Sequence, residues 1–363
     1  MSATRRFLRL GLFLAVLALA LGLYLYQQLE HPRARYPVSE ITLFIPLGTP
    51  TSDIFRQLAA DGVVRFPWFA EAYYRVARSA TPLQAGEYRF EQPTPLSRVI
   101  DRMSRGDVVR HVIIVPEGLT AEETFALFWS RGISRPQAFR NAFRNPQLVS
   151  SIGGATDLEG FLFPDTYAVT RSTSARQIVE LMLANFRKHF TSELREKARA
   201  NGLSLRDTVT LASIVQKETA LPREEAIIAG IYWNRLRRGM RLQADPTVAY
   251  ALRLQGQWNG TLYRSDYGFE SDYNTYLHAG LPPGPICSPG VAALRAAASP
   301  ASTEFLYFVA DGAGGHRFSR TFEEHRDAIA AIRRQREEPP EPAPPPPPEN
   351  GTAAGSPPSP PSS

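Results

Sequence analysis

One carboxylate, Glu218, stands where the charged form of a carboxyl group is disfavoured. Residues 205–220 read as an α-helix because apolar residues and this acid recur at i, i+3, i+4 and i+7, namely Leu211, Ile214, Val215 and Glu218. Leu221-Pro222 should close the helix and leave Glu218 beside the unpaired carbonyl groups of its last turn. Partial burial and these carbonyls both favour the neutral acid, so we expect a raised pKa. A carboxyl still protonated near neutral pH can donate a proton to a leaving oxygen, as the general acid of a glycosidase does.

A plainer interpretation of Glu218 stays open on this pattern. The side chain could rotate into solvent at the helix end, or pair with Lys217 or Arg223. Surface and paired acids outnumber catalytic ones, so the helix pattern alone does not decide between the two interpretations.

Several segments around Glu218, in the same order along the chain, resemble the endolytic murein transglycosylase family, the YceG-like or MltG proteins. The resemblance extends from about the apolar N-terminal segment to the start of the Pro-rich tail. The matching segments are residues 211–219, 231–236, 238–248, 273–276 and 280–284. It implies cleavage of the MurNAc to GlcNAc β-1,4 bond of peptidoglycan without water, which leaves a 1,6-anhydro-MurNAc end, and it places the catalytic glutamate on Glu218. It implies no cofactor. It also implies substrate contacts in the other segments, which we expect from Asn234, Gln243, Tyr273, Asn274, Thr275 and Tyr276.

The chain departs from the resemblance at Gln216, where many relatives have Glu. An acidic pair is thereby reduced to a single acid. Residues two apart on a helix do not share a face, so the change also removes a competing candidate for the general acid.

The other polar residues near Glu218 each have a structural interpretation beside a functional one. Asn234 could be a buried capping partner or a ligand to a sugar hydroxyl, and Asp245, followed by Pro246, is expected to cap a helix. Residues 273–276 form a polar, aromatic loop that suits a sugar polymer, or an ordinary turn with exposed tyrosines. Glu159, in segment 158–167, is a candidate second acid, beside a core strand expected at 161–163.

Composition narrows the remaining chemistries. The chain has 363 residues and a net charge of +6, but its arginines are dispersed and form no basic block with interleaved aromatics, so nothing indicates nucleic-acid binding. The histidines lack metal-ligand spacing, and Ser213 does not lie in a nucleophile elbow. The single cysteine, Cys287, has no neighbouring base and is expected to be structural.

The N-terminus predicts a membrane anchor. Arg5, Arg6 and Arg9 precede an apolar run at 10–26, which is just long enough to cross a bilayer and ends in two tyrosines. Positive charge on the short leading side predicts a cytoplasmic N-terminus (1–9), with the remainder on the periplasmic or extracytoplasmic side of the inner membrane. A cleaved signal peptide is the competing interpretation, because Ala18-Leu-Ala20 has the small-x-small form.

The remaining chain predicts an α+β fold. Residues 40–106 read as a small βααβ module similar to a LysM-like glycan-binding module, although Thr49 stands where an acidic residue is common there; a simple spacer is the alternative. Residues 107–336 should form a larger mixed α/β catalytic domain. The Pro-rich tail at 337–363 cannot form a core and should be disordered.

Three functional hypotheses follow: a membrane-anchored lytic transglycosylase, a peptidoglycan hydrolase that uses Asp245 or Glu159 beside Glu218, and a non-catalytic wall-binding scaffold. The expected partners, by resemblance, are peptidoglycan strands, penicillin-binding proteins and the wall-elongation machinery.

Overall fold

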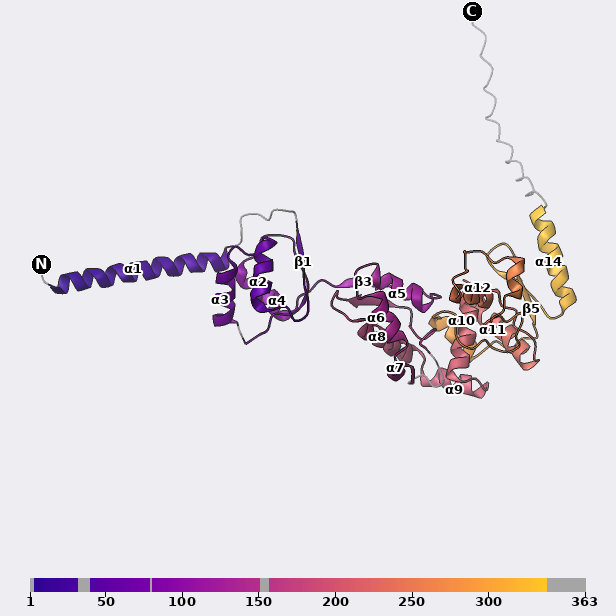
Figure 1. Ribbon diagram of the computed structural model, residues 1–363. Coiled ribbons are helices and arrows are strands. Elements are labelled where there is room, and N and C mark those ends of the chain that lie inside the picture. Colours follow the sequence, from indigo (N-terminus) through magenta and orange to yellow (C-terminus); the bar gives the residue numbers. More distant parts are fainter. Residues whose placement is uncertain (1–2, 32–39, 79, 151–156, 338–363) are drawn as a thin grey trace, which may run out of the picture. The chain divides into compact units, whose positions relative to one another are not determined.

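The protein is described by a computed structural model that covers residues 3–31, 40–78, 80–150 and 157–337 (Figure 1). The chain divides into two compact units, Met1–Glu304 and Phe305–Ser363. Within the covered residues, helices alternate with six strands that pair into three two-stranded antiparallel sheets. The prediction of a mixed helix and strand fold is therefore confirmed, whereas the predicted tail beyond residue 337 lies outside the described residues.

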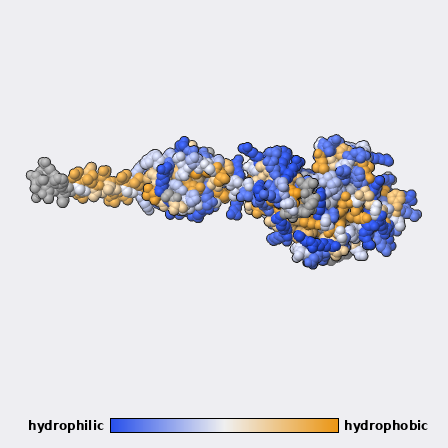
Figure 2. All heavy atoms as spheres, turned by 60° about the horizontal axis from the view of Figure 1, so that its bottom comes forward, coloured by the Kyte–Doolittle hydropathy of each residue, from blue (hydrophilic) through white to orange (hydrophobic). Residues whose placement is uncertain are grey.

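An apolar helix, α1 (Ala3–Glu30), begins the chain. Its segment Leu10–Glu30 is 21 residues long, has a mean hydropathy of 2.0 and is not buried against the rest of the protein. From Leu10 onward it is a rod covered with hydrophobic side chains (Figure 2). Its length and composition suit a membrane span, and a signal sequence would have the same properties.

The predicted βααβ order of the small module is confirmed. Strands β1 (Ile41–Ile45) and β2 (Gly86–Phe90) pair antiparallel and flank helices α2 (Thr51–Ala60) and α3 (Pro67–Ala77). Helix α4 (Leu96–Arg105) follows. It is closed by Gly106, whose φ of 67° lies in the left-handed region that glycine commonly adopts at the C-terminal end of an α-helix.

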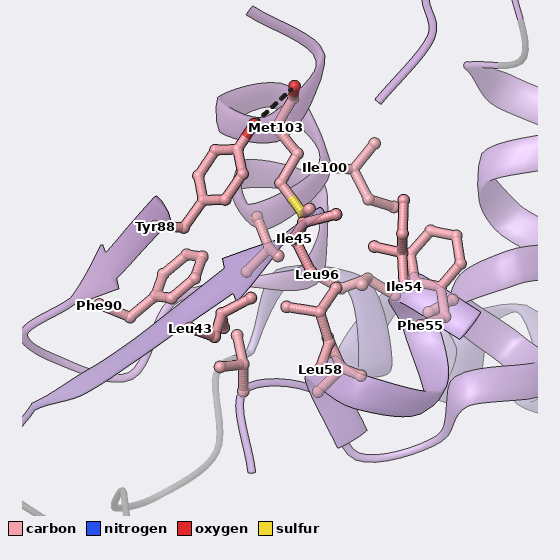
Figure 3. Close-up of a cluster of buried hydrophobic side chains, with 14 of the residues drawn as sticks. Leu43, Ile45, Ile54, Phe55, Leu58, Tyr88, Phe90, Leu96, Ile100 and Met103 are labelled. Carbon is pink, nitrogen blue, oxygen red and sulfur yellow. Dashed lines mark hydrogen bonds between the residues drawn. The ribbon is translucent and has the colours of Figure 1, made fainter. Parts of the chain in front are cut away.

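The module has a hydrophobic core of its own (Figure 3). One face of the β1–β2 pair packs onto α2 and α4, and Phe55, Leu58, Tyr88 and Phe90 are completely buried there. The Tyr88 hydroxyl donates hydrogen bonds to the Gln84 and Met103 carbonyls, at 2.7 and 3.3 Å. A separate core indicates that these residues form a folding unit within the chain.

The next part of the chain contains a two-stranded antiparallel sheet whose strands are separated in sequence by three helices among the described residues. Strands β3 (His111–Ile114) and β4 (Thr166–Val169) pair antiparallel. Capping boxes, Thr120 with Glu123 and Ser174 with Gln177, begin two helices of this part, at Ala121 and Ala175. The helices are α5 (Ala121–Trp129), α6 (Pro136–Phe143), α7 (Pro146–Ser150), α8 (Ala175–His189) and α9 (Ser192–Ala200).

The core strand predicted at residues 161–163 was wrong. These residues form a turn, and the strand begins only at Thr166. Gly160 has a φ of 83°, and a Cβ there would lie 2.4 Å from Pro285 Cβ, so the chain bends where it passes Pro285. The apolar character of the segment was predicted correctly, because Phe161, Leu162 and Phe163 are all buried.

The predicted acid lies on a helix that packs among several others. Helix α10 (Leu205–Glu218) begins with a capping box between Ser204 and Asp207. It packs against α11 (Pro222–Arg237), α12 (Asp245–Leu254) and α13 (Val291–Ala298). The short 3₁₀ helix η1 (Arg264–Gly268) lies in the long connection between α12 and α13.

The second unit is small. Strands β5 (Tyr307–Ala310) and β6 (His316–Ser319) form an antiparallel hairpin, followed by helix α14 (Phe322–Glu337). A turn at residues 311–315 joins the two strands, and the Asp311 N–H donates to the Gly315 carbonyl at 2.8 Å.

Candidate active site

Glu218 is the last residue of α10, which ends two residues before the predicted end at residue 220 but keeps Glu218 in its last turn, as expected. Leu211, Ile214 and Val215 on the same face are completely buried, while Glu218 itself is half-buried. The chain leaves the helix in extended conformation at Thr219, so the carboxyl stands where a hydrophobic ridge ends. The alternative in which Glu218 turns freely into solvent does not describe this structure.

Tyr232 holds Glu218 in place. This tyrosine lies on α11, is 1% exposed, and its hydroxyl donates a hydrogen bond to Glu218 Oε1 at 2.5 Å. Helix α11 sits close to the segment after α13 because Gly230 has no side chain: a Cβ there would lie 2.4 Å from the Ala301 carbonyl oxygen. Sequence reasoning missed Tyr232, although a tyrosine on the buried face of a helix must find a partner for its hydroxyl.

The pKa of Glu218 is raised from 4.5 to about 7. Burial is the largest cause, and the negative charge of Asp245 acts in the same direction. The hydrogen bond from Tyr232 and the positive charge of Arg235 lower the pKa and partly oppose these effects. Glu218 therefore exists in both protonation states near neutral pH, which an acid that must also act as a base requires.

Asp245 is a second carboxylate whose charge acts on Glu218, and its predicted capping role was wrong. It is the first residue of α12, the N-cap position belongs to Ala244, and no side-chain capping bond is present. Instead, Asp245 Oδ1 accepts a hydrogen bond from the Tyr276 hydroxyl at 2.5 Å, and Oδ2 accepts one from the Tyr267 hydroxyl at 3.3 Å. The two tyrosine rings pack with their centroids 4.5 Å apart. The Asp245 side chain is thus bound by residues distant in the sequence, which a capping rule based on neighbouring residues cannot predict.

Asn274 and Thr275 are buried and bind within the protein. The Asn274 amide donates to the carbonyls of Tyr267 and Phe269, at 3.0 and 2.8 Å. The Thr275 hydroxyl lies 2.9 Å from that of Thr247 and accepts a hydrogen bond from the Ala244 N–H at 3.0 Å. Both side chains therefore fix the loop that carries Tyr276 beside the start of α12.

Gln243 is exposed and adopts an unusual backbone conformation. Its φ is 49°, in the left-handed region that non-glycine residues seldom occupy, and its N–H donates to the Thr275 carbonyl at 3.1 Å. Leu242 and Ala244 on either side are completely buried, so the backbone is fixed and the Gln243 side chain is presented outward.

The remaining predicted site residues differ in their surroundings. Asn234 Nδ2 donates to the Thr303 carbonyl at 2.7 Å, which is the structural interpretation of this residue. Tyr273 is half-buried, and its ring packs 4.9 Å from that of Tyr250.

Glu159, the other candidate second acid, lies in the interior. It is 6% exposed and accepts hydrogen bonds from the Ala121 N–H at 3.0 and 3.2 Å and from the Tyr250 hydroxyl at 3.3 Å. Burial raises its pKa to about 8, although the backbone bonds oppose this. These contacts join the start of α5 to α12, so Glu159 serves the packing of the fold.

Gln216 also has a structural partner. Its Oε1 accepts a hydrogen bond from the N–H of Gly290, the N-cap of α13, and so joins the end of α10 to the start of α13. The Glu117 carboxylate lies against the same glycine. The buried Glu225, whose Oε2 has no hydrogen-bond partner, is influenced by Glu117, and its pKa is raised to about 7, mainly by burial.

Two further expectations concern reactive groups. Cys287 is buried, as predicted, and its thiol lies 3.3 Å from the Ser213 carbonyl; burial raises the pKa of the thiol far above its usual range. Within the described part of the chain, no group of three or more His, Cys, Asp or Glu side chains could hold a metal ion.

A half-buried carboxyl group, bound by a tyrosine hydroxyl and placed beside a second, tyrosine-bound carboxylate, defines a site for general acid–base chemistry. The chain belongs to the YceG-like family, whose model matches residues 43–331.

Characterised relatives carry one common name. The chain is similar to the endolytic murein transglycosylase of Streptococcus pneumoniae D39, with 28% identity over 321 residues that cover 80% of this chain and 58% of the relative. The chain thus spans less than two thirds of the length of that relative. It is 27% identical to the endolytic murein transglycosylase of Bacillus subtilis 168 over 334 residues, which cover 85% of this chain and 89% of the relative.

A solved structure supports the fold. The crystal structure of a YceG-like protein from Listeria monocytogenes superposes with a TM-score of 0.54 at 28% sequence identity, and the match covers 80% of this chain and 98% of that one.

Proposed function

We propose that the protein is an endolytic lytic transglycosylase that cleaves the MurNAc to GlcNAc β-1,4 bond of peptidoglycan strands and leaves a 1,6-anhydro-MurNAc end. The observation that carries the proposal is Glu218: a half-buried carboxyl group, held by Tyr232, with its pKa raised to about 7. Membership of the YceG-like family and the names of its relatives support the same substrate.

The reaction needs one group that first gives and then takes a proton. Neutral Glu218 protonates the leaving GlcNAc oxygen as its bond to C1 of MurNAc breaks. The 6-hydroxyl of the same MurNAc then attacks C1 and gives its proton to the Glu218 carboxylate. The nucleophile is already tethered to the reacting sugar, so no water has to be positioned. A pKa near 7 suits both half-reactions.

The loop beside Asp245 supplies the substrate contacts of this proposal. Gln243 is exposed on a fixed backbone, and Tyr273 and Tyr276 are half-buried with aromatic surface that can pack against sugar rings. Asn274 and Thr275 do not contact the glycan directly in this proposal but hold the loop that carries Tyr276 in position. Asn234 likewise has a structural role, through its hydrogen bond to the Thr303 carbonyl.

The N-terminal helix places the reaction at a membrane in this proposal. Helix α1 anchors the chain in the inner membrane as a single span, with the arginine-rich end cytoplasmic and the catalytic part on the periplasmic or extracytoplasmic side. The small module, which has the βααβ order of a LysM-like module, binds glycan there. The partners that we propose are nascent peptidoglycan strands, penicillin-binding proteins and the wall-elongation machinery.

One observation favours a second candidate. Asp245 is close enough to influence the pKa of Glu218, so a hydrolase in which Asp245 activates water is the alternative reaction. The two reactions differ in their product, since hydrolysis leaves a reducing end in place of an anhydro end.

Digestion of purified peptidoglycan by the full-length protein in detergent, followed by mass spectrometry of the products, tests the proposal. Anhydro ends are expected from the wild type and none from Glu218→Gln. Reducing ends would support the hydrolase, and no release at all would leave only a wall-binding scaffold. Glu225→Gln is a matched control, because it neutralises another buried glutamate whose pKa is also about 7 but leaves Glu218 and its partners in place.

A further inference from the structure

The hydrogen bond between Tyr232 and Glu218 has a fixed direction. Burial, reinforced by the nearby charge of Glu218, raises the pKa of the Tyr232 phenol far above its ordinary value, so its hydroxyl keeps its proton. In the structure this hydroxyl donates to Glu218 Oε1. A neutral Glu218 must then carry its own proton on Oε2.

Asp245 stands in the opposite relation to Glu218. Both of its oxygens accept hydrogen bonds from tyrosines, Oδ1 from Tyr276 and Oδ2 from Tyr267. Two tyrosine hydroxyls hold the Asp245 carboxylate in place, and its negative charge favours the neutral form of Glu218. Tyr232 does the reverse, because a donated hydrogen bond stabilises the anion.

We propose that Tyr232 and the tyrosine-bound Asp245 are two opposing positioning residues for Glu218: Tyr232 assigns the transferable proton to Oε2 and stabilises the carboxylate left behind, while Asp245 favours return of the proton. The proposal rests on the proposed function for its place in catalysis, but the geometry that it describes belongs to the free protein.

In the proposed reaction the two carboxyl oxygens of Glu218 have different roles. The Oε2 proton moves to the leaving GlcNAc oxygen as the C1–O bond breaks, and Oε1 keeps its bond to Tyr232 while the charge develops. The MurNAc O6 then bonds to C1, and its proton returns to Oε2. Glu218 ends the cycle as it began, so the step needs no co-reactant.

The charged and titratable groups that act on Glu218 come from two other helices and one loop. Tyr232 and Arg235 come from α11, Asp245 from α12, and Tyr276, whose own pKa Glu218 raises, from the loop. Tyr232 and Arg235 lower the pKa of Glu218, and Asp245 raises it. Removing Tyr232 or Asp245 must therefore move the pKa of Glu218 in opposite directions.

Infrared difference spectroscopy of the full-length protein in detergent tests this without substrate. The carbonyl band of protonated Glu218 is identified by its loss in Glu218→Gln and followed with pH. Its midpoint should be near pH 7 in the wild type. It should rise by about one pH unit in Tyr232→Phe and fall by a similar amount in Asp245→Asn, as single neighbouring groups generally shift a pKa.

Tyr167→Phe is the matched control, since it also removes a buried tyrosine hydroxyl bond, to the Phe163 carbonyl at 2.6 Å, outside the site. It should lower thermal stability to a similar degree as Tyr232→Phe and leave the midpoint unchanged. Shifts of Tyr232→Phe and Asp245→Asn in the same direction, or no shift in either, would overturn the proposal.

Kinetics on purified peptidoglycan then place the pair in catalysis. Tyr232→Phe should reduce kcat about tenfold or more with KM changed less than about twofold, because the bond matters most when Glu218 is charged. In a plot of kcat against pH, the decrease on the alkaline side should shift in Tyr232→Phe and in Asp245→Asn by the same amount as the midpoint of the Glu218 carbonyl band. If the wild type released no anhydro ends, the proposed function would fail, but the titration would still test the roles of Tyr232 and Asp245. A titration without opposite shifts would overturn those roles and leave the proposed function standing.

Discussion

The side-chain oxygen of Gln216 accepts a hydrogen bond from the backbone N–H of Gly290 at 2.7 Å. The bond joins the helix that ends in Glu218 to the helix that Gly290 begins. Gln216→Leu should therefore leave a buried donor without a partner and lower the free energy of unfolding by about 1–3 kcal/mol. Thermal or urea unfolding of the full-length protein measures this.

Gln216→Glu keeps the acceptor but adds a charge near Glu117, whose carboxylate lies against Gly290. We expect a smaller loss of stability than for Gln216→Leu, because the acceptor for the Gly290 N–H is kept. Equal stability of the leucine variant and the wild type would show that the bond to Gly290 contributes nothing.

The raised pKa of Glu159 makes stability depend on pH. Its pKa is about 8 in the folded protein and 4.5 as an ordinary carboxyl, so the folded state retains a proton that the unfolded chain releases. The stability due to this proton is complete below about pH 4.5 and is lost as the pH rises toward 8. Glu159→Gln stays neutral, so from pH 5 to pH 8 the wild type should lose at least about 1 kcal/mol relative to the variant.

Urea denaturation at several pH values measures this difference. Glu180→Gln, which changes an exposed glutamate, serves as the control and should show no such trend. A gap between Glu159→Gln and wild type that does not vary with pH would contradict a buried, neutral Glu159.

Gln243 should matter for binding and little for folding. Its side chain is exposed, so Gln243→Ala should raise KM several-fold at nearly unchanged kcat if the amide contacts glycan. Gln243→Gly should give the same KM and a free energy of unfolding within about 1 kcal/mol of the wild type, because relief of the left-handed conformation offsets the greater freedom of glycine in the unfolded chain. Unchanged kinetics in both variants would remove Gln243 from the site.

Asn274 and Tyr276 lie two residues apart and should respond differently. Asn274→Ala leaves the Tyr267 and Phe269 carbonyls without their amide donor and should lower the unfolding free energy by about 1–3 kcal/mol. Tyr276→Phe removes one hydroxyl bond to the exposed Asp245 and should reduce kcat/KM with a change in Tm of only about 2 °C. Limited proteolysis of residues 261–281 should increase for Asn274→Ala and not for Tyr276→Phe.

The small module should fold alone. Its core is formed by its own strands and helices, so a fragment of residues 40–106 should unfold in a single cooperative transition. Phe55→Ala should cost about 3–5 kcal/mol and abolish folding of so small a unit. Trp68→Ala changes a largely exposed residue and should leave folding intact, which makes it the control; sedimentation of the fragment with peptidoglycan then tests glycan binding.

Local patterns predicted most of the elements near the site. Helix α10 begins at Leu205 as predicted and ends at Glu218, two residues before the predicted end, because apolar periodicity is a local signal that locates a helix better than its last turn. The segment at 161–163 was misread because three apolar residues between Gly160 and Pro164 are too few to distinguish a strand from a buried turn.

The acid itself could be predicted, but its partners could not. Glu218 ends a local apolar ridge, whereas Tyr232 and Asp245 approach it only after helices fold back on one another. The role of Asp245 was misjudged for the same reason: Asp-Pro before a helix suggests a cap, while the tyrosines that bind it come from residues 267 and 276. Pairings of this kind depend on tertiary packing and leave no periodic signal.

Helices α10 and α11 are joined by only three residues, Thr219 to Leu221, and the acid and its tyrosine lie on either side of this elbow. An extra residue in so short a hinge would rotate one helix against the other and carry the hydroxyl out of reach of the carboxyl. Outer loops of this protein should therefore tolerate changes in length better than the connection between α10 and α11, where an insertion or deletion would separate Tyr232 from Glu218. The length of this connection, and not only the identity of its residues, therefore sets the geometry of the proposed active site.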